Sequence, residues 1–227
     1  MAWLFEARKR YGLSILNYIV TSNHVHLLVS GEGDRDAIPK SIQLLAGKTG
    51  QEYNQRKKRK GAFWEDRYHA TAVERDVHLA RCMVYIDMNM VRAGVVDNPE
   101  DWPFCGYNEI LHLPKRYGLI DTAKVIALLQ MRDFEELQES RKHLIEEALE
   151  STNHGRVSKW TESIAVGSKG FIEATKERLG IRAKGRKVFR NNGAYELREP
   201  AAPYKGVFDP ENVVLRLENT YFWRDNP

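Results

Sequence analysis

The sequence predicts a mixed α+β fold, because two kinds of hydrophobic pattern follow each other in its first half. Residues 15–29 are rich in β-forming side chains, and the polar residues 21–23 divide them into two stretches of strand length. Residues 37–55 and 75–94 instead repeat their apolar side chains at helical spacing. The first run therefore predicts two antiparallel strands, and each later run predicts a helix.

The composition is that of a folded protein with a hydrophobic core. The 227 residues are 42% hydrophobic and 29% charged, with 35 Lys and Arg against 31 Asp and Glu, a formal charge of +4. These values exclude a wholly disordered or fibrous chain. Two cysteines are too few for a disulfide framework, and no apolar run approaches the roughly 20 residues of a membrane span. We therefore expect a cytoplasmic protein without a membrane partner.

Between the two predicted helices the chain is first basic and then aromatic. Five consecutive basic residues, 56–60, follow the first helix and end at Gly61, which is typical of a helix C-terminus that runs into a loop. Such a run is either a solvated surface or a contact to phosphates. The aromatic residues 62–69 come next and predict a short strand. Aromatic rings beside a basic loop also suit stacking on unpaired bases.

The helix predicted over residues 75–94 has two faces of different character. Its apolar stripe consists of Leu79, Cys82, Met83, Ile86 and Met90. The polar face on the opposite side consists of Arg81, Tyr85, Asn89 and Arg92. We expect the stripe to pack on the core and the polar face to point away from it.

The second half of the chain separates acidic from basic residues. A helix in two pieces is predicted over residues 121–150, whose eight acidic and four basic side chains indicate a solvated packing helix. Residues 156–190 reverse the balance, with ten basic and three acidic side chains, and are a second candidate contact for an anionic partner. This segment includes a predicted helix over residues 168–179, and the tail after it is expected to be extended.

Two pairs of side chains could carry chemistry. In a strand, alternate side chains share a face, so the imidazoles of His24 and His26 lie together and could share one divalent ion. The alternative for this pair is polar packing without a ligand. Tyr85 and Asn89 project together because they are four residues apart on a helix. The alternative for Tyr85 is an ordinary aromatic side chain at the rim or in the core.

Taken together, the two pairs predict a reaction at a phosphodiester. A divalent ion held by His24 and His26 polarises the phosphodiester, and Tyr85 attacks it to give a phosphotyrosyl intermediate. Arg81 and Arg92, on the same helix, favour the anionic phenol and hold a phosphate beside it.

Four segments, in order along the chain, resemble one known family. They are Asn23-His-Val-His-Leu-Leu-Val, Gly61-Ala-Phe-Trp-Glu-Asp-Arg-Tyr, Tyr85-Ile-Asp-Met-Asn-Met-Val-Arg-Ala-Gly-Val-Val and Pro99-Glu-Asp-Trp-Pro-Phe-Cys-Gly-Tyr. From about residue 12 to residue 107 the chain resembles the single-tyrosine HUH transposases, which are also called IS200-like. Among them, the REP-associated tyrosine transposases are closest in appearance. Four motifs in the right order are far more specific than any one of them.

The resemblance implies a ferredoxin-like HUH domain, in which an antiparallel sheet carries helices on one face. Relatives begin with a further strand and helix, whereas only residues 1–9 precede the region that leads into the first predicted strand. We therefore expect the first strand of the family to be lacking. We place this catalytic domain over residues 1–114, and a mostly helical, partly basic carboxy-terminal region over residues 115–227.

The resemblance also implies an activity and the residues that perform it. Such proteins cleave and rejoin single-stranded DNA near hairpins through a 5′-phosphotyrosine intermediate, with Mg²⁺ or Mn²⁺. By position, Tyr85 is the nucleophile, and His24, His26 and Asn89 are metal ligands. The residues that we assign to DNA contact are Arg56, Lys57, Lys58, Arg59, Lys60, Trp64, Arg67, Arg81 and Arg92.

Two alternative functions stay open. The first is a catalytically degenerate descendant that binds DNA hairpins without cutting them, which the short amino terminus motivates. The second is a nuclease directed at RNA. The sequence leaves open whether the protein is a monomer or a homodimer, and the resemblance implies that it is associated with the nucleoid.

Overall fold

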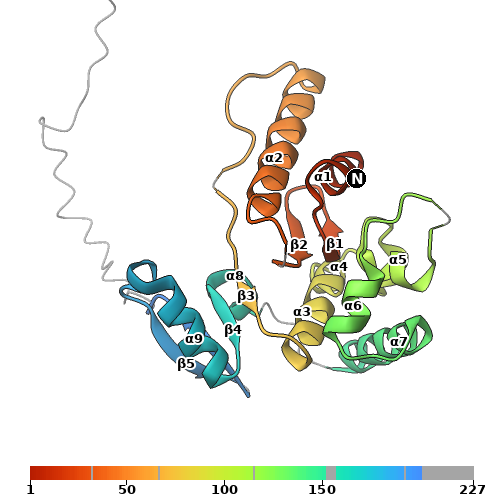
Figure 1. The fold of residues 1–227 in the computed structure, drawn as a ribbon. Coiled ribbons are helices and arrows are strands. Elements are labelled where there is room, and N and C mark those ends of the chain that lie inside the picture. Colours follow the sequence, from red (N-terminus) through yellow and green to blue (C-terminus); the bar gives the residue numbers. More distant parts are fainter. Residues whose placement is uncertain (32, 66, 115, 152–156, 192, 201–227) are drawn as a thin grey trace, which may run out of the picture.

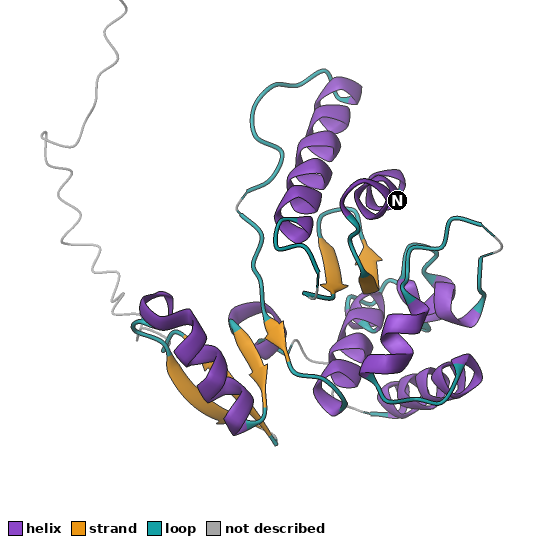
Figure 2. Ribbon diagram, in the orientation of Figure 1, coloured by secondary structure: helices purple, strands orange, loops and turns teal. Residues whose placement is uncertain are grey.

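The computed structural model describes residues 1–31, 33–65, 67–114, 116–151, 157–191 and 193–200. Helices and strands are both present, so the predicted α+β fold is confirmed (Figures 1 and 2). Arg156, at the start of the basic segment, and the tail after residue 200 lie outside this part of the chain. None of the helices within it is long and apolar enough to cross a membrane.

A β-hairpin forms the sheet of the amino-terminal half. Strands β1 (Ile15–Val20) and β2 (Val25–Val29) pair antiparallel, with Tyr18 opposite Leu27 and Ile19 opposite His26. The two antiparallel strands predicted from the sequence are thereby confirmed.

Two helices flank this hairpin in the chain and pack against each other. Helix α1 (Ala2–Tyr11) precedes it and ends at Gly12, whose φ of 66° is a left-handed conformation that glycine adopts readily. Helix α2 (Ala37–Arg56) follows the hairpin, as the sequence predicted. The far end of α2, which carries the basic residues 56–60, extends away from the helices that follow it in the chain (Figure 1).

Later segments of the chain cover the free edge of β1. Ile19 forms an isolated antiparallel bridge with Cys105, and Ile15 forms an isolated parallel bridge with Ile120. The Val20 amide also donates a hydrogen bond to the Phe104 carbonyl oxygen at 2.9 Å. Within the described part of the chain, this sheet therefore consists of two strands and isolated bridges.

The predicted strand and helix after α2 are shifted along the chain. The strand falls at β3 (Ala72–Val73), after residues 62–69, and the helix begins at α3 (Val77–Asp87). At Met88, φ of −72° and ψ of 4° open the helix, so its last part is a separate turn, α4 (Asn89–Arg92). The short η1 (Pro99–Asp101) and α5 (Gly106–Leu111) follow.

The carboxy-terminal region contains the predicted helices and also a sheet. The two-piece helix is confirmed as α6 (Thr122–Leu128) and α7 (Phe134–Glu150). The helix predicted over residues 168–179 is confirmed as α9 (Lys169–Leu179). The remaining elements are α8 (Lys159–Glu162), β4 (Ala165–Gly167), η2 (Gly180–Ala183), β5 (Lys187–Asn191) and β6 (Ala194–Arg198).

The second sheet joins distant parts of the chain, in the order β3-β4-β6-β5. Strand β3 pairs parallel with β4, so that Ala72 lies opposite Ala165, while β4 and β5 each pair antiparallel with β6. Helix α9 packs on this sheet through Ile172, which shares a small core with Ala165 and Leu197. The amino-terminal half thus contributes a strand to a sheet of the carboxy-terminal region.

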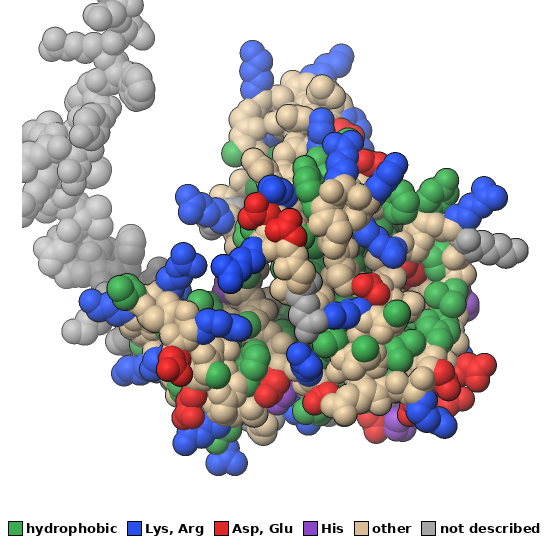
Figure 3. Space-filling view, viewed as in Figure 1, with side chains coloured by type: hydrophobic (Ala, Val, Ile, Leu, Met, Phe, Trp, Pro, Cys, Tyr) green, Lys and Arg blue, Asp and Glu red, His purple; other side chains and the backbone are tan. Residues whose placement is uncertain are grey.

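The main hydrophobic core takes residues from both sides of the predicted division at residue 114. Ile19, Met83 and Ile110 lie in it together with Leu137 and Ile145 of α7. The apolar side of α7 is thus buried in this core, while most of its other side chains are acidic. In Figure 3 the acidic side chains gather over α7, whereas Lys and Arg side chains gather over the far end of α2.

A buried ion pair connects α3 to α7, and a hydrogen bond connects the same carboxylate to β1. The Arg141 guanidinium of α7 donates to the Asp87 carboxylate of α3, and both side chains are fully buried. Asn17 of β1 donates to Asp87 Oδ1 at 2.8 Å and to the Met83 carbonyl oxygen at 3.2 Å. Burial raises the pKa of Asp87, and Arg141 and Asn17 oppose that rise. This network fixes the helix that carries Tyr85 against the strand next to the His pair.

Gly106 allows α5 to begin close against β1. A Cβ atom at this position would meet the Asn17 side-chain oxygen, the Ile120 side chain and the Tyr18 backbone nitrogen. We expect Gly106→Ala to lower the free energy of unfolding by about 1–3 kcal/mol, because overpacking displaces backbone. Chemical denaturation measures the effect. Gly47→Ala is the control: no neighbour lies within 4 Å there, so we expect stabilisation of about 0.5–1 kcal/mol. Equal effects of both variants would contradict the prediction.

Candidate active site

His24 lies in the tight turn before β2, where neighbouring polar groups hold its ring. The Thr21 hydroxyl donates to the His24 carbonyl oxygen at 2.9 Å and accepts from the His24 amide at 3.1 Å. Asn23 Oδ1 lies 2.7 Å from His24 Nδ1. The Thr21 hydroxyl oxygen also lies 3.1 Å from Nδ1, so two polar groups orient this edge of the ring.

The other ring nitrogen of His24, Nε2, faces the side chain of Asn89. His24 Nε2 lies 3.1 Å from Asn89 Oδ1. This contact is a hydrogen bond when Nε2 carries a proton, and the same two atoms are both possible metal ligands when it does not. The distance is close to the roughly 3 Å expected of neighbouring ligands that each lie about 2.1 Å from an octahedral ion.

His26 lies between His24 and Tyr85. Its ring centroid is 5.0 Å from that of His24 and 6.0 Å from that of Tyr85, and both pairs of rings meet edge to face. Among the described residues, no group of three or more His, Cys, Asp or Glu side chains could hold a metal ion. The possible metal ligands that lie together here are the imidazoles of His24 and His26 and the carboxamide of Asn89.

Tyr85 is more buried than its place on the polar helix face predicted. It is only 8% exposed and belongs to the main core. The Arg92 guanidinium lies 4.1 Å from the Tyr85 ring centroid and donates to the Tyr85 carbonyl oxygen at 2.7 Å. The ring of Trp160, from α8, lies 6.2 Å away. Tyr85 lies opposite the apolar stripe, but Arg92 and α8 cover its ring, so its burial is that of a core aromatic side chain.

The two arginines expected to flank Tyr85 have different surroundings. Arg92 contacts the Tyr85 ring, and burial lowers the pKa of Arg92 while Tyr85 opposes that shift. Arg81 is exposed and lies near His78 and Lys159, whose pKa values it helps to lower. In both of those groups burial is the larger cause of the shift. The positive charge next to Tyr85 thus comes from Arg92, whereas Arg81 of α3 lies near Lys159 of α8.

The basic loop and its aromatic neighbours form a separate cluster at the far end of α2. The guanidinium carbons of Arg56 and Arg59 lie 5.9 and 5.7 Å from the Tyr53 ring centroid. Trp64 Nε1 donates to the Ala46 carbonyl oxygen at 3.0 Å, and its ring is 37% exposed. The other predicted contacts of this part of the chain, Lys57, Lys58, Lys60 and Arg67, are exposed. This end of α2 lies away from α3 and α8 (Figure 1), so the structure does not bring the basic residues 56–60 to Tyr85.

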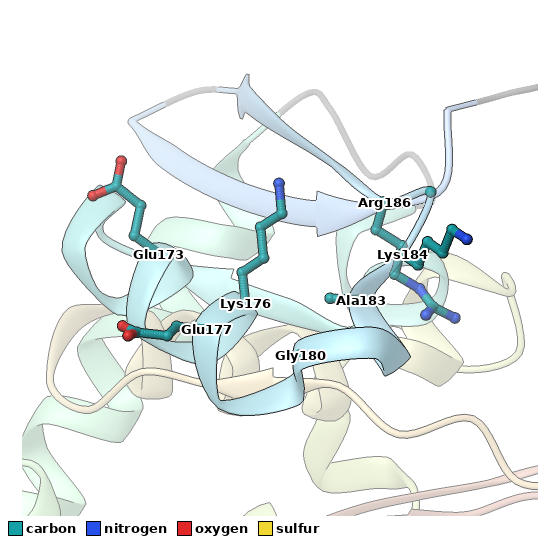
Figure 4. A pocket seen from close by; sticks show the side chains of 8 residues that line it. Glu173, Lys176, Glu177, Gly180, Ala183, Lys184 and Arg186 are labelled. Atoms are coloured by element: carbon teal, nitrogen blue, oxygen red, sulfur yellow. The ribbon is translucent and has the colours of Figure 1, made fainter.

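The basic carboxy-terminal segment lines an open pocket between α9 and residues 180–186, which precede β5. Figure 4 shows Lys176 on α9, with Lys184 and Arg186 to one side of it and Glu173 to the other. Arg186 forms an ion pair with Glu199 at 3.2 Å. The charges of this pocket are therefore mixed, although the segment as a whole is basic.

Sequence reasoning missed three groups of residues around this site. Thr21 and Asn23 hold His24, Asn17 and Arg141 hold Asp87, and α8 brings Trp160 to Tyr85. Asn23 adjoins the His motif and could have been noted as a partner of the first imidazole. The other contacts join residues more than 50 positions apart or depend on the turn geometry, and no local pattern indicates them.

Comparison with known proteins gives one match. Residues 2–89 match the family model described as "Transposase IS200 like". The matched range includes β1, β2, α2 and α3 and ends at Asn89, whereas α8 lies outside it. A search of the curated proteins and a search of the solved structures each found no significant match.

Proposed function

Because residues 2–89 match the IS200-like transposase family model, we propose that the protein cleaves and rejoins single-stranded DNA near hairpins. The observation that carries the proposal is that His24, His26, Asn89 and Tyr85 lie together. The two histidines come from the β1–β2 hairpin, Tyr85 from α3 and Asn89 from α4. The family match supports a transposase-like function with DNA as the partner. The position of these four side chains supports a nucleophilic mechanism.

The reacting group in this proposal is the Tyr85 hydroxyl. Its oxygen attacks the phosphorus of the scissile phosphodiester, the phenolic proton passes to solvent, and a 5′-phosphotyrosine bond forms. The bond between phosphorus and the 3′ oxygen breaks, and the departing 3′ oxygen takes up a proton to become a free hydroxyl. Attack by a 3′-hydroxyl on the phosphotyrosine reverses these steps and joins a strand. Arg92 holds the phenol ring in place and brings positive charge next to the phosphate.

His24, His26 and Asn89 would hold a divalent ion, Mg²⁺ or Mn²⁺. Such an ion, when bound, withdraws electrons from the phosphate oxygens and stabilises the charge that develops there. Two imidazole nitrogens and one amide oxygen suit Mn²⁺ better than Mg²⁺, which prefers oxygen ligands. Thr21 and Asn23 keep His24 Nε2 directed toward Asn89.

The test is covalent capture of DNA by the purified full-length protein. Hairpin oligonucleotides with single-stranded flanks, labelled on either side of the hairpin, are incubated with Mn²⁺, with Mg²⁺ or with a chelator, and the products are separated under denaturing conditions. We expect a metal-dependent protein–DNA adduct that carries the label on the 3′ side of the cut. Hairpin binding without any adduct would overturn the enzymatic proposal and favour a catalytically degenerate hairpin-binding protein. An RNA hairpin of the same sequence tests the nuclease alternative.

His24→Ala should remove the metal site. We expect at least a tenfold loss of Mn²⁺ affinity in calorimetric titration and about a hundredfold slower adduct formation, because one ligand and its orienting contacts are lost.

The matched control is His143→Ala, since His143 is exposed on α7 and pairs only with Glu147 among the residues described. It should leave Mn²⁺ affinity and adduct formation unchanged. If His24→Ala bound Mn²⁺ like the unaltered protein, the proposed ligand set would be wrong.

A further inference from the structure

Helix α8 brings a part of the chain outside the matched family range to Tyr85. Hydrogen bonds to the segment before β3 hold it there: the Thr71 hydroxyl donates to the Ser163 carbonyl oxygen at 2.6 Å, and His69 Nε2 lies 3.0 Å from the same oxygen. The parallel pairing of β3 with β4 continues this attachment. The position of α8 is thus fixed by backbone groups and does not depend on the tryptophan that it carries.

Trp160 on α8 is a half-buried aromatic ring beside the proposed nucleophile. One part of it packs against the main core and meets the Tyr85 ring at 6.2 Å with an angle of 39° between the planes. Such a tilted contact at this distance leaves the indole without a full stacking partner. An exposed part of a large ring next to a reacting group is suited to receive a second flat ring.

One cation lies over the ring of Trp160, and a second lies near that cation. Lys159 Nζ lies 5.0 Å from the Trp160 ring centroid. Burial lowers the pKa of Lys159, and the nearby Arg81 lowers it further, while Glu196 opposes both. Among the residues that the structure describes, neither Lys159 nor Arg81 forms an ion pair with a carboxylate. Two cations held close together without a paired carboxylate repel each other, and a bound anion would relieve that repulsion.

We propose that Trp160 stacks on an unpaired base of the DNA strand that enters the site, and that Lys159 and Arg81 bind the phosphate next to that base. This inference rests on the proposed function and adds to it a nucleotide-binding position that the carboxy-terminal region supplies. In single-stranded DNA, each unpaired base offers a flat ring, and a phosphate lies next to it along the strand. That combination matches an indole with two adjacent cations. In a duplex the base would be paired and its face covered, so the position selects an unpaired nucleotide.

The experiment separates stacking from charge with two probes of equal length and charge. One is a labelled oligothymidylate, and the other is an abasic oligodeoxynucleotide with the same number of phosphates. Affinities are measured by fluorescence anisotropy with the full-length protein in a chelator, so that no strand is cut. The variants are Trp160→Leu, Trp160→Phe and Lys159→Gln.

The matched control is Trp3→Leu. Trp3 also carries a lysine over its ring, since Lys48 Nζ lies 5.5 Å from the ring centroid, but it belongs to α1. Trp3→Leu therefore removes a comparable tryptophan–lysine contact at a position away from Tyr85.

We expect Trp160→Leu to weaken oligothymidylate binding about tenfold and to leave the affinity for the abasic strand within about twofold. Trp160→Phe, which keeps an aromatic face, should retain most of the affinity, and Trp3→Leu should change neither value. Lys159→Gln should weaken both probes equally and reduce the slope of log affinity against log salt by about 0.7.

A Trp160→Leu variant that lost affinity equally for both probes, or for neither, would overturn the stacking role. Thermal melting identifies a variant that has merely unfolded, and Trp160→Phe and Lys159→Gln then decide the outcome. If Trp160→Leu kept the preference for oligothymidylate over the abasic strand and still formed the covalent adduct, only this inference would be refuted. Failure of the unaltered protein to bind single strands or hairpins would refute the proposed function as well.

Discussion

Tyr85→Phe should abolish formation of the covalent protein–DNA adduct, with a fall in rate of at least about a thousandfold. The substitution removes only the hydroxyl oxygen that attacks phosphorus. It keeps the ring that contacts His26, Trp160 and Arg92, so the fold and the DNA contacts should be retained. The measurement pairs denaturing electrophoresis of the adduct with hairpin affinity, which should stay within about twofold.

The control for this prediction is a second buried tyrosine of the same core. Tyr107 lies 2% exposed in the main core, and burial raises its pKa to about 12. Tyr107→Phe should therefore leave adduct formation largely intact. Comparable adduct yields from Tyr85→Phe and the unaltered protein would show that another group attacks the DNA.

Arg141→Met should lower the free energy of unfolding by about 3–5 kcal/mol, because it leaves the Asp87 carboxylate buried without its partner. Asn17 would still donate to Asp87, but a single neutral donor does not replace the guanidinium. Without Arg141, burial would raise the pKa of Asp87 further, so the variant should regain part of its stability as the pH falls and Asp87 takes up a proton. Urea denaturation at several pH values measures both effects.

Two further variants separate the loss of charge pairing from the loss of packing. Combining Asp87→Leu with Arg141→Met removes both charges and should restore much of the stability, since a buried ion pair costs about as much to desolvate as it returns. Two nitrogens of Arg141, Nε and Nη1, are buried without a hydrogen-bond partner in the described structure, which adds to this cost. Arg132→Met should change stability little, because Arg132 is exposed and pairs with Glu136 at the surface. Equal stability of the single and double variants would contradict this account.

The strands and most helices could be predicted because each leaves a local pattern. The run over residues 15–29 gave the hairpin, and the apolar stripe from Leu79 to Met90 gave the buried side of α3 and α4. The strand expected over residues 62–69 was misplaced because aromatic content alone predicted it. The two-residue strand β3 exists only through its partner β4, more than 90 residues later in the chain.

The proposed metal ligands and nucleophile could be named from the sequence because they lie in short motifs with fixed spacing. The structure adds that His24 faces Asn89 and that His26 lies beside Tyr85. It also corrects the surroundings of Tyr85. Helical periodicity places a side chain on a face of its own helix but does not indicate which distant segment will cover that face.

By itself, the sequence determined the fold class, the match of residues 2–89 to the IS200-like transposase model and the identity of the candidate reacting residues. Only the tertiary structure decided that Arg92 contacts the Tyr85 ring, that Arg81 lies near Lys159, and that Trp160 contacts the Tyr85 ring. The physical reason is the range of the interactions. Periodicity and motifs record contacts within a few residues along the chain. The contacts of Lys159 and Trp160 instead arise when the β3–β4 pairing brings a late segment against α3, and the contact of Arg92 with Tyr85 depends on the break between α3 and α4 at Met88.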